Sequence, residues 1–146
     1  MAEEPDAERM LAARMRVTAV RLIRRLREQT GDAISPAQLS LLSCLYRSGP
    51  MSPRALAIED GVRPPSVTRM VAGLADRGLI TRRPHPTDGR QVVVELTTTG
   101  RERIEEEISA RERWLERRLA ELDADERAAL VRAVEIIDRM TSTPPG

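Results

Sequence analysis

Hydrophobic residues recur every three or four positions over most of the chain, and this spacing predicts helices. The first periodic segment spans about residues 7–29, and its apolar side carries Leu11, Met15, Ala19, Leu22 and Leu26. The sequence Thr30-Gly31-Asp32 is expected to end this helix. Ser35-Pro36 then supplies a capping residue followed by proline at the first helical position. The second helix is expected to run to about Arg47 and to be buried on much of its surface.

Two shorter helical segments follow. Ser52-Pro53 opens a helix over about residues 54–59, in which Leu56 and Ile58 are both expected to reach the core. Pro64 begins another helix that runs to Arg77, and its core-facing side carries Val67, Met70, Val71 and Leu74. Gly78 is expected to stop this helix. Two short helices joined by a tight turn form a helix-turn-helix.

Beyond Gly78 the hydrophobic pattern changes to the alternation that is typical of strands. Residues 79–83 and 91–96 are predicted to form two strands, joined by a loop that contains two prolines and the pair Asp88-Gly89. Thr97 can cap a long helix to about residue 122, and Asp123 with Glu126 forms a capping box for a last helix through Met140. The predicted fold class is therefore mainly α with a small β-hairpin wing, a winged helix-turn-helix with long N- and C-terminal dimerisation helices.

The terminal helices carry more apolar surface than one small domain can cover. We therefore expect residues 1–34 and 100–146 to form a helical dimerisation region and residues 35–99 to form the winged helix-turn-helix, within one structural unit. The alternative is that these helices pack only within one chain. The residues expected to contact a second copy are Leu11, Met15, Leu22, Leu115, Leu119, Leu122, Leu130 and Ile137.

Composition and charge narrow the choice of partner. The chain is 40% hydrophobic and only 1% aromatic, and its charges nearly cancel to a formal net charge of +1, so net charge alone identifies no partner. Residues 61–93, however, contain six Arg and two acidic residues, which gives this segment a local charge of +4. Residues 100–146 contain nine Arg and twelve acidic residues, which gives a local charge of −3. A basic segment around a helix-turn-helix is typical of a nucleic-acid-binding face, although chance clustering on a solvated surface would look the same.

Candidate DNA contacts lie on the exposed side of the helix that begins at Pro64 and on the wing. An Arg can pair with guanine in the major groove and a Thr offers a hydroxyl and a methyl, whereas Pro64 and Pro65 have no N–H for a phosphate. At the wing tip, Arg90 is expected to enter the minor groove, and Asp88 and Gly89 are expected to shape the turn. The full set of predicted DNA-binding residues is Ser52, Arg54, Arg63, Ser66, Thr68, Arg69, Arg82, Arg83, His85 and Arg90.

Two motifs in this region resemble those of the MarR family (multiple-antibiotic-resistance regulators). Residues 88–100 match the family's D-x-R, five residues, L-T-x-x-G pattern, and residues 74–82 resemble its L-x-x-x-G-L-I-x-R junction between recognition helix and wing. The resemblance implies a two-fold dimer on pseudo-palindromic operators, often released by a small phenolic or other aromatic ligand bound between the dimer and DNA-binding regions. The start Arg63-Pro64-Pro65 departs from the family, which is richer in Ser and Thr there. The first helix also lacks the Cys that peroxide-sensing members use.

The chain is therefore predicted to be a cytoplasmic, sequence-specific regulator of transcription that binds duplex DNA as a homodimeric repressor. A winged-helix module that binds proteins and not DNA is the alternative. Catalysis, a cofactor and a metal are not expected, because there is one His, no metal-spaced cluster and no Gly-rich phosphate loop.

The single Cys, Cys44, excludes an internal disulfide and is expected to be a core thiol. Trp114 and Tyr46 could line a ligand site or anchor the structure.

Neither a signal peptide nor a membrane span is expected from the sequence. The opening residues 1–8 are acidic, and no apolar run approaches the length needed to cross a bilayer.

Overall fold

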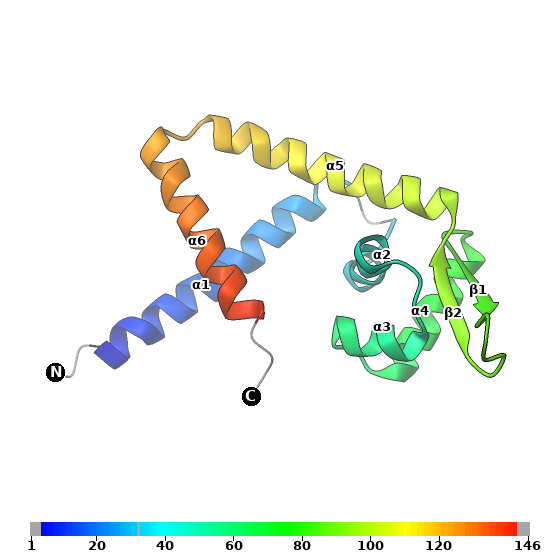
Figure 1. The fold of residues 1–146 in the computed structure, drawn as a ribbon. Coiled ribbons are helices and arrows are strands. Elements are labelled where there is room, and N and C mark those ends of the chain that lie inside the picture. The colour runs from blue at the N-terminus through cyan, green and yellow to red at the C-terminus, as the bar shows by residue number, and fades with distance from the viewer. Residues whose placement is uncertain (1–3, 32, 143–146) are drawn as a thin grey trace.

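The computed structural model describes residues 4–31 and 33–142. Within these residues the chain forms α1 (Glu4–Arg27), α2 (Pro36–Ser48), α3 (Pro53–Asp60), α4 (Pro64–Asp76), β1 (Ile80–Pro84), β2 (Val92–Leu96), α5 (Thr98–Ala120) and α6 (Ala124–Ser142). Helices α2, α3 and α4 and the hairpin form one lobe, α1 and α6 cross in a second lobe, and α5 runs from the first to the second (Figure 1). The predicted winged helix-turn-helix with long terminal helices is confirmed.

Helix ends follow the capping chemistry of the sequence. The Gln38 N–H donates to Ser35 Oγ over 3.2 Å and the Ser35 N–H donates to Gln38 Oε1 over 3.1 Å, so both residues cap α2. Asp123 and Glu126 form the same reciprocal pair at the start of α6. Such bonds satisfy N–H groups that a helix start leaves unpaired. Helix α1 ends at Arg27, two residues earlier than predicted, because residues 28–30 form a turn.

The core of the winged lobe is aliphatic, as the scarcity of aromatic residues requires. Its most completely buried side chains are Leu41, Leu42, Leu45, Leu56, Val67, Leu74, Ile80, Val94 and Ile104. The prediction that Ile58 also reaches this core was wrong, because its side chain is 74% exposed. Residues two apart on a helix point about 200° away from each other, so the short helix α3 cannot bury both Leu56 and Ile58 on one side.

Strands β1 and β2 pair antiparallel, from Ile80 opposite Leu96 to Pro84 opposite Val92. Met51 adds a backbone bridge to Val94, with N–H···O distances of 3.1 and 2.8 Å, which the sequence pattern did not predict. Strand β1 begins one residue later than expected, because the Leu79 N–H donates to the Leu74 carbonyl and not to the neighbouring strand. The hairpin therefore extends the lobe and carries its loop away from the core (Figure 1).

Helix α5 is fixed to the hairpin at its first turn. Thr97 Oγ1 accepts the Gly100 N–H over 2.9 Å, which confirms Thr97 as the cap, and donates to the Gly78 carbonyl over 2.6 Å. Gly100 is buried against the Leu79 carbonyl, and a Cβ at this position would overlap the oxygen and lie 2.8 Å from the carbonyl carbon. The Thr and Gly of the L-T-x-x-G motif therefore let α5 pack directly on the backbone between α4 and the wing.

The terminal helices leave much apolar surface uncovered. Among the side chains that the structure describes, neither α1 nor α6 has a buried residue. Of the predicted dimerisation residues, Leu115 and Leu122 are half-buried, whereas the other six are exposed, with exposed fractions between 36% and 56%. Where α1 meets α6, a shallow groove of about 370 Å³ is lined in part by Leu11, Met15 and Ile137. An exposed apolar surface of this extent is typical of an interaction site.

No helix in the described part of the chain has the length and apolar content required to cross a membrane.

Candidate nucleic-acid interface

Helix α4 presents the predicted contact residues on the side opposite the core. Val67, Val71 and Leu74 are buried, whereas Thr68 and Arg69 are exposed and Ser66 is half-buried. The Thr68 hydroxyl donates to the Pro64 carbonyl over 3.1 Å, which orients the hydroxyl oxygen and its methyl group. Arg63 precedes the helix, is exposed and makes no side-chain cap. The end of the lobe at the start of α4 therefore carries two exposed guanidinium groups.

The start of α3 lies beside the wing. Ser52 caps α3 by accepting the Ala55 N–H over 3.1 Å, so its hydroxyl oxygen is already engaged while its hydrogen can still be donated. Ser52, Pro53 and Arg54 line a shallow cleft together with Gln91 and Val92 at the start of β2. The exposed Arg54 side chain is thus placed next to the hairpin by the tertiary fold.

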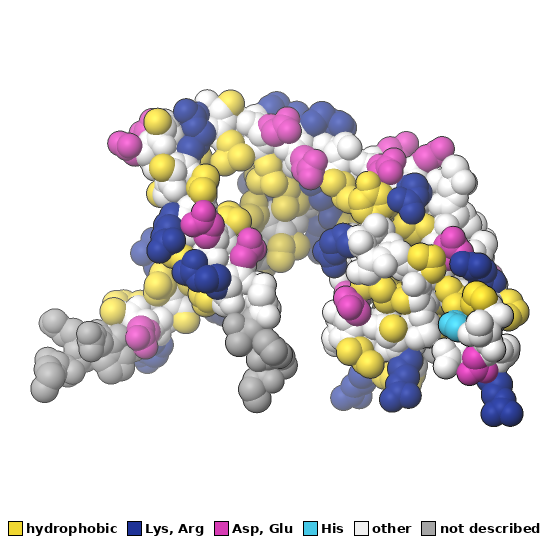
Figure 2. Space-filling view, in the orientation of Figure 1, with side chains coloured by type: hydrophobic (Ala, Val, Ile, Leu, Met, Phe, Trp, Pro, Cys, Tyr) yellow, Lys and Arg dark blue, Asp and Glu magenta, His cyan; other side chains and the backbone are white. Residues whose placement is uncertain are grey.

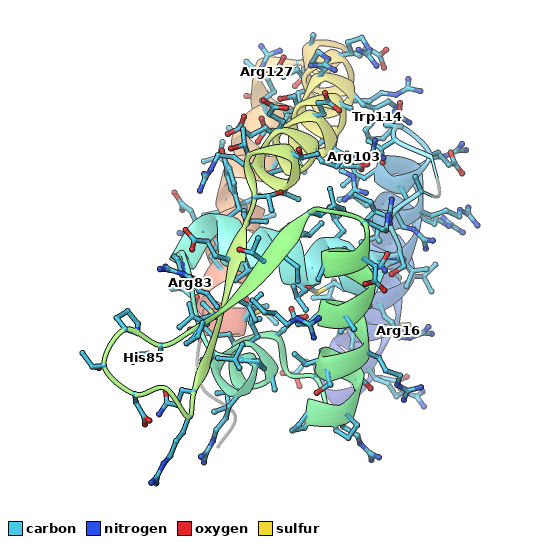
Figure 3. All side chains as sticks on the ribbon, turned by 90° about the vertical axis from the view of Figure 1, so that its right-hand side faces the viewer. Arg16, Arg83, His85, Arg103, Trp114 and Arg127 are labelled. Atoms are coloured by element: carbon cyan, nitrogen blue, oxygen red, sulfur yellow. The ribbon has the colours of Figure 1, made fainter. Side chains whose placement is uncertain are left out.

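Side-chain hydrogen bonds hold the turn at the wing tip. The Arg90 N–H donates to Asp88 Oδ1 over 3.1 Å. His85 Nδ1 accepts the N–H groups of Thr87 and Asp88, each over 3.2 Å, and Figure 3 shows His85 inside the loop. Asp88 and His85 therefore shape the turn, and the Arg90 guanidinium is left exposed at its tip.

Not every arginine of the basic segment is free for DNA. Arg83 Nε pairs with Glu95 Oε2 at 2.9 Å, and Arg77 Nη1 donates to the Ala33 carbonyl over 2.8 Å, which ties the end of α4 to the segment before α2. Of the predicted contacts, the following have exposed side chains and no ion pair within residues 4–31 and 33–142: Arg54, Arg63, Arg69, Arg82 and Arg90. Figure 2 shows basic side chains extending from the lower edge of the winged lobe, and all of them are Arg because the chain has no Lys.

A second basic region lies on α1 and was missed when charges were compared only between the middle and C-terminal segments. Residues 9–27 hold seven Arg and no acid, and all seven side chains are exposed. Arg9 pairs with Asp6 and Arg25 with Glu28. A count of charges along the first helix would have found this region.

A cleft of about 290 Å³ lies where α1, α2 and α5 meet. Its lining includes Arg27, Arg47 and Arg111, with Ser40, Ser43 and the apolar side chains of Ile23 and Leu39. Burial lowers the pKa of the Arg111 guanidinium and nearby Arg27 adds to this, whereas the Glu107 carboxylate opposes it. Arg111 already pairs with Glu107 at 3.6 Å, and Arg27 and Arg47 add further positive charge to the lining, so the cleft has a basic wall.

The two large aromatic side chains do not line this cleft. The Tyr46 hydroxyl donates to Glu105 Oε1 over 3.4 Å beneath the Arg101 guanidinium, and Arg118 lies 5.6 Å from the centre of the Trp114 ring.

Cys44 is 2% exposed, and burial raises the pKa of its thiol, with a smaller contribution from Glu59, so it is the core thiol that the sequence predicted. No cluster of three His, Cys, Asp or Glu side chains suited to a metal occurs in the described residues.

Two short helices with exposed arginines beside an arginine-bearing hairpin define a winged helix-turn-helix DNA-binding protein. The sequence model of the MarR family matches residues 34–92. An uncharacterized HTH-type transcriptional regulator, ML2140 of Mycobacterium leprae, is 41% identical over 96% of this chain and 99% of its own length. The chain therefore belongs to the MarR family of transcription regulators, which bind DNA and are not enzymes.

Two further relatives extend the comparison. The structure of a MarR family protein from Bacillus stearothermophilus has a TM-score of 0.82 at 26% identity, over 98% of this chain and 99% of that chain. The HTH-type transcriptional repressor MdtR of Bacillus subtilis is 30% identical over 65% of this chain and 61% of its own length.

Proposed function

We propose that this protein is a cytoplasmic, homodimeric repressor that binds pseudo-palindromic operators in duplex DNA. The observation that carries the proposal is one edge of the winged lobe, where exposed, unpaired arginines extend from α3, α4 and the hairpin (Figure 2). Arginines from three separate elements thus bring positive charge to the same edge, which suits a ligand that carries phosphates along its length. The name of MdtR, a repressor, supports repression over activation.

The contact residues take different roles in this proposal. Thr68 and Arg69 read base edges in the major groove, with Ser66 at the rim, because they lie on the exposed side of α4. Arg90 enters the minor groove from the wing tip. Arg54, Arg63 and Arg82 contact phosphates, and Ser52 donates its hydroxyl to one. Arg83 and His85 contribute less, because Glu95 and the wing turn already engage them.

Residues 1–34 and 100–146 form the dimerisation region in this proposal, and residues 35–99 form the DNA-binding region. The support is the apolar surface of α1 and α6, which a second copy would bury. A two-fold dimer places two recognition helices about one DNA turn, roughly 34–36 Å, apart. Replacing Ile137 with Asp should therefore give monomers in sedimentation, whereas Ile58→Asp, on the exposed side of α3, should remain dimeric.

A small ligand releases the DNA by binding in the cleft between α1, α2 and α5. Its lining of arginines, serine hydroxyls and two aliphatic side chains suits an anion with an apolar part. Both regions contribute to the cleft, so a ligand there can change how the winged lobe sits against α1.

The DNA proposal is tested with duplex fragments selected from the source genome by the purified protein. Binding should weaken steeply with salt, and Arg90→Ala should lower affinity by about ten- to a hundredfold at fixed salt while the dimer persists. Arg113→Ala, on the exposed side of α5, is the matched control and should bind as the wild type does.

Retained binding by Arg90→Ala would show that the wing-tip assignment is wrong. A wild-type protein with no salt-dependent affinity for any duplex would favour the interaction-module alternative.

A further inference from the structure

Glu107 is the only buried carboxylate in the described part of the chain, with 4% of its surface exposed. It lies on α5 between two arginines, each four residues away. Its Oε1 lies 3.1 Å from Arg103 Nη2 and its Oε2 lies 3.6 Å from Arg111 Nη2. One carboxylate therefore pairs with two partly buried guanidinium groups on the same side of the helix and offsets only one of their two positive charges.

The network continues beyond α5 to the turn that follows α1. Arg111 Nη2 donates to Thr30 Oγ1 over 3.4 Å, and the turn containing Thr30 leads into the start of α2. Two stretches of chain join the terminal helices to the winged lobe, namely this linking segment and α5 itself (Figure 1). Glu107 and Arg111 thus connect α5 and the linking segment at one place. Figure 3 shows Arg103 beside α5, above the winged lobe.

Stability alone gives a poor reason for these charges. Burying ions costs desolvation, and apolar side chains of similar volume often stabilise a fold as well or better. Here the network is also incompletely satisfied, because the Nε atoms of Arg103 and Arg111 are buried without a hydrogen-bond partner. A better-supported use of buried charge is to favour one arrangement of the surrounding elements over its alternatives.

We propose that Glu107 is a positioning residue for DNA binding, which holds the winged lobe at a fixed angle to α1 through Arg111 and Thr30, with Arg103 as its second partner on α5. In a two-fold dimer this angle sets the separation of the two recognition helices. Without the carboxylate, the guanidinium groups of Arg103, Arg111 and nearby Arg27 repel one another, and the contact with Thr30 is lost. The proposal rests on the proposed function, because it assumes a dimer that binds two half-sites.

The test compares Glu107→Gln with Glu106→Gln. Glu106 is the neighbouring residue on α5, and its side chain is exposed and unpaired, so this variant is a matched control. Each dimer is titrated with a selected operator and with versions that carry one or two extra base pairs between the half-sites. Wild type and Glu106→Gln should discriminate strongly between spacings. In Glu107→Gln the ratio of affinities for the different spacings should fall at least about fivefold, while the protein remains dimeric.

Uniform weakening on all three duplexes, or no change, would overturn the proposal, since a merely structural residue affects every spacing alike. Arg111→Gln guards against a folding failure, because it keeps the shorter pair between Glu107 and Arg103 and removes the Arg111 side of the network, namely its pair with Glu107 and its link to Thr30. It should lose the same discrimination, and wild-type spacing preference in that variant would also overturn the proposal.

A DNA-independent measurement separates this proposal from the proposed function. A spin label on Thr87→Cys, in a Cys44→Ala background, reports the wing-to-wing distance in the dimer. The distance distribution should be narrow in that background and in Glu106→Gln, and broader in Glu107→Gln. Equal distributions would refute the positioning role even for a protein that bound no duplex.

Discussion

Replacing Gly100 with Ala tests how α5 is attached to the winged lobe. The added Cβ would overlap the Leu79 carbonyl oxygen and lie 2.8 Å from its carbon and 3.2 Å from its Cα. These are backbone atoms, and the same carbonyl accepts the Thr97 N–H over 3.1 Å. The overlap can be relieved only if α5 or the segment between α4 and β1 moves.

The expected cost follows from two opposing effects. Overpacking a close contact costs about 1–3 kcal/mol, and more when backbone must shift. Alanine in place of glycine returns at most about 1 kcal/mol of helix propensity, and less in a first turn. We therefore expect a net loss of about 2 kcal/mol, which lowers Tm by roughly 4–8 °C for a chain of this size.

The measurement is thermal unfolding followed by circular dichroism at one fixed protein concentration, because the Tm of a dimer depends on concentration. Gly73→Ala is the matched control, since a Cβ there meets only Gln38 Nε2 at 3.9 Å. Because Gly73 also lies in a helix, its replacement by alanine should raise Tm by about 2–4 °C through helix propensity. A Gly100→Ala protein as stable as the wild type would refute the close-contact argument.

Three further outcomes are expected. Thr97→Val removes the cap on the Gly100 N–H and the bond to the Gly78 carbonyl, so the free energy of unfolding should fall by about 1–2 kcal/mol in denaturant titration. Asp88→Ala removes the acceptor for the Arg90 N–H at an exposed turn, so operator affinity should fall about three- to tenfold with Tm almost unchanged; a large Tm loss would contradict that reasoning. Cys44, whose thiol pKa is raised by burial, holds less thiolate at pH 8 than a free cysteine, so a disulfide reagent should react roughly tenfold or more slowly until the protein is unfolded.

Local features of the fold were predictable because their causes lie within a few residues. A capping residue, a following proline or a change from helical to alternating hydrophobicity acts over one turn, so α2, α3 and α6 begin where the sequence indicates. The exposed side of α4 followed in the same way from helical spacing around Val67, Val71 and Leu74.

Features that join distant segments were not predictable from such patterns. The sequence placed six arginines in one basic segment, but it could not tell that Arg77 reaches Ala33 and that Arg83 pairs with Glu95. Arg111 likewise interrupts the apolar stripe that Ile104, Ile108 and Leu115 form on the long helix, and helical spacing alone offers no reason for an arginine there. The structure explains the interruption, because Glu107 and Thr30 lie beside the guanidinium.

The sequence by itself determined the order of the elements, their caps, the aliphatic core and the family motifs of the wing. Only the tertiary structure decided which arginines remain exposed, why residue 100 must be Gly, and where the terminal helices connect to the winged lobe. The physical reason is the range of the interactions: helix spacing and caps depend on neighbours three or four residues away, whereas Gly100 on Leu79 and Arg111 on Thr30 depend on segments that meet only after the chain has folded.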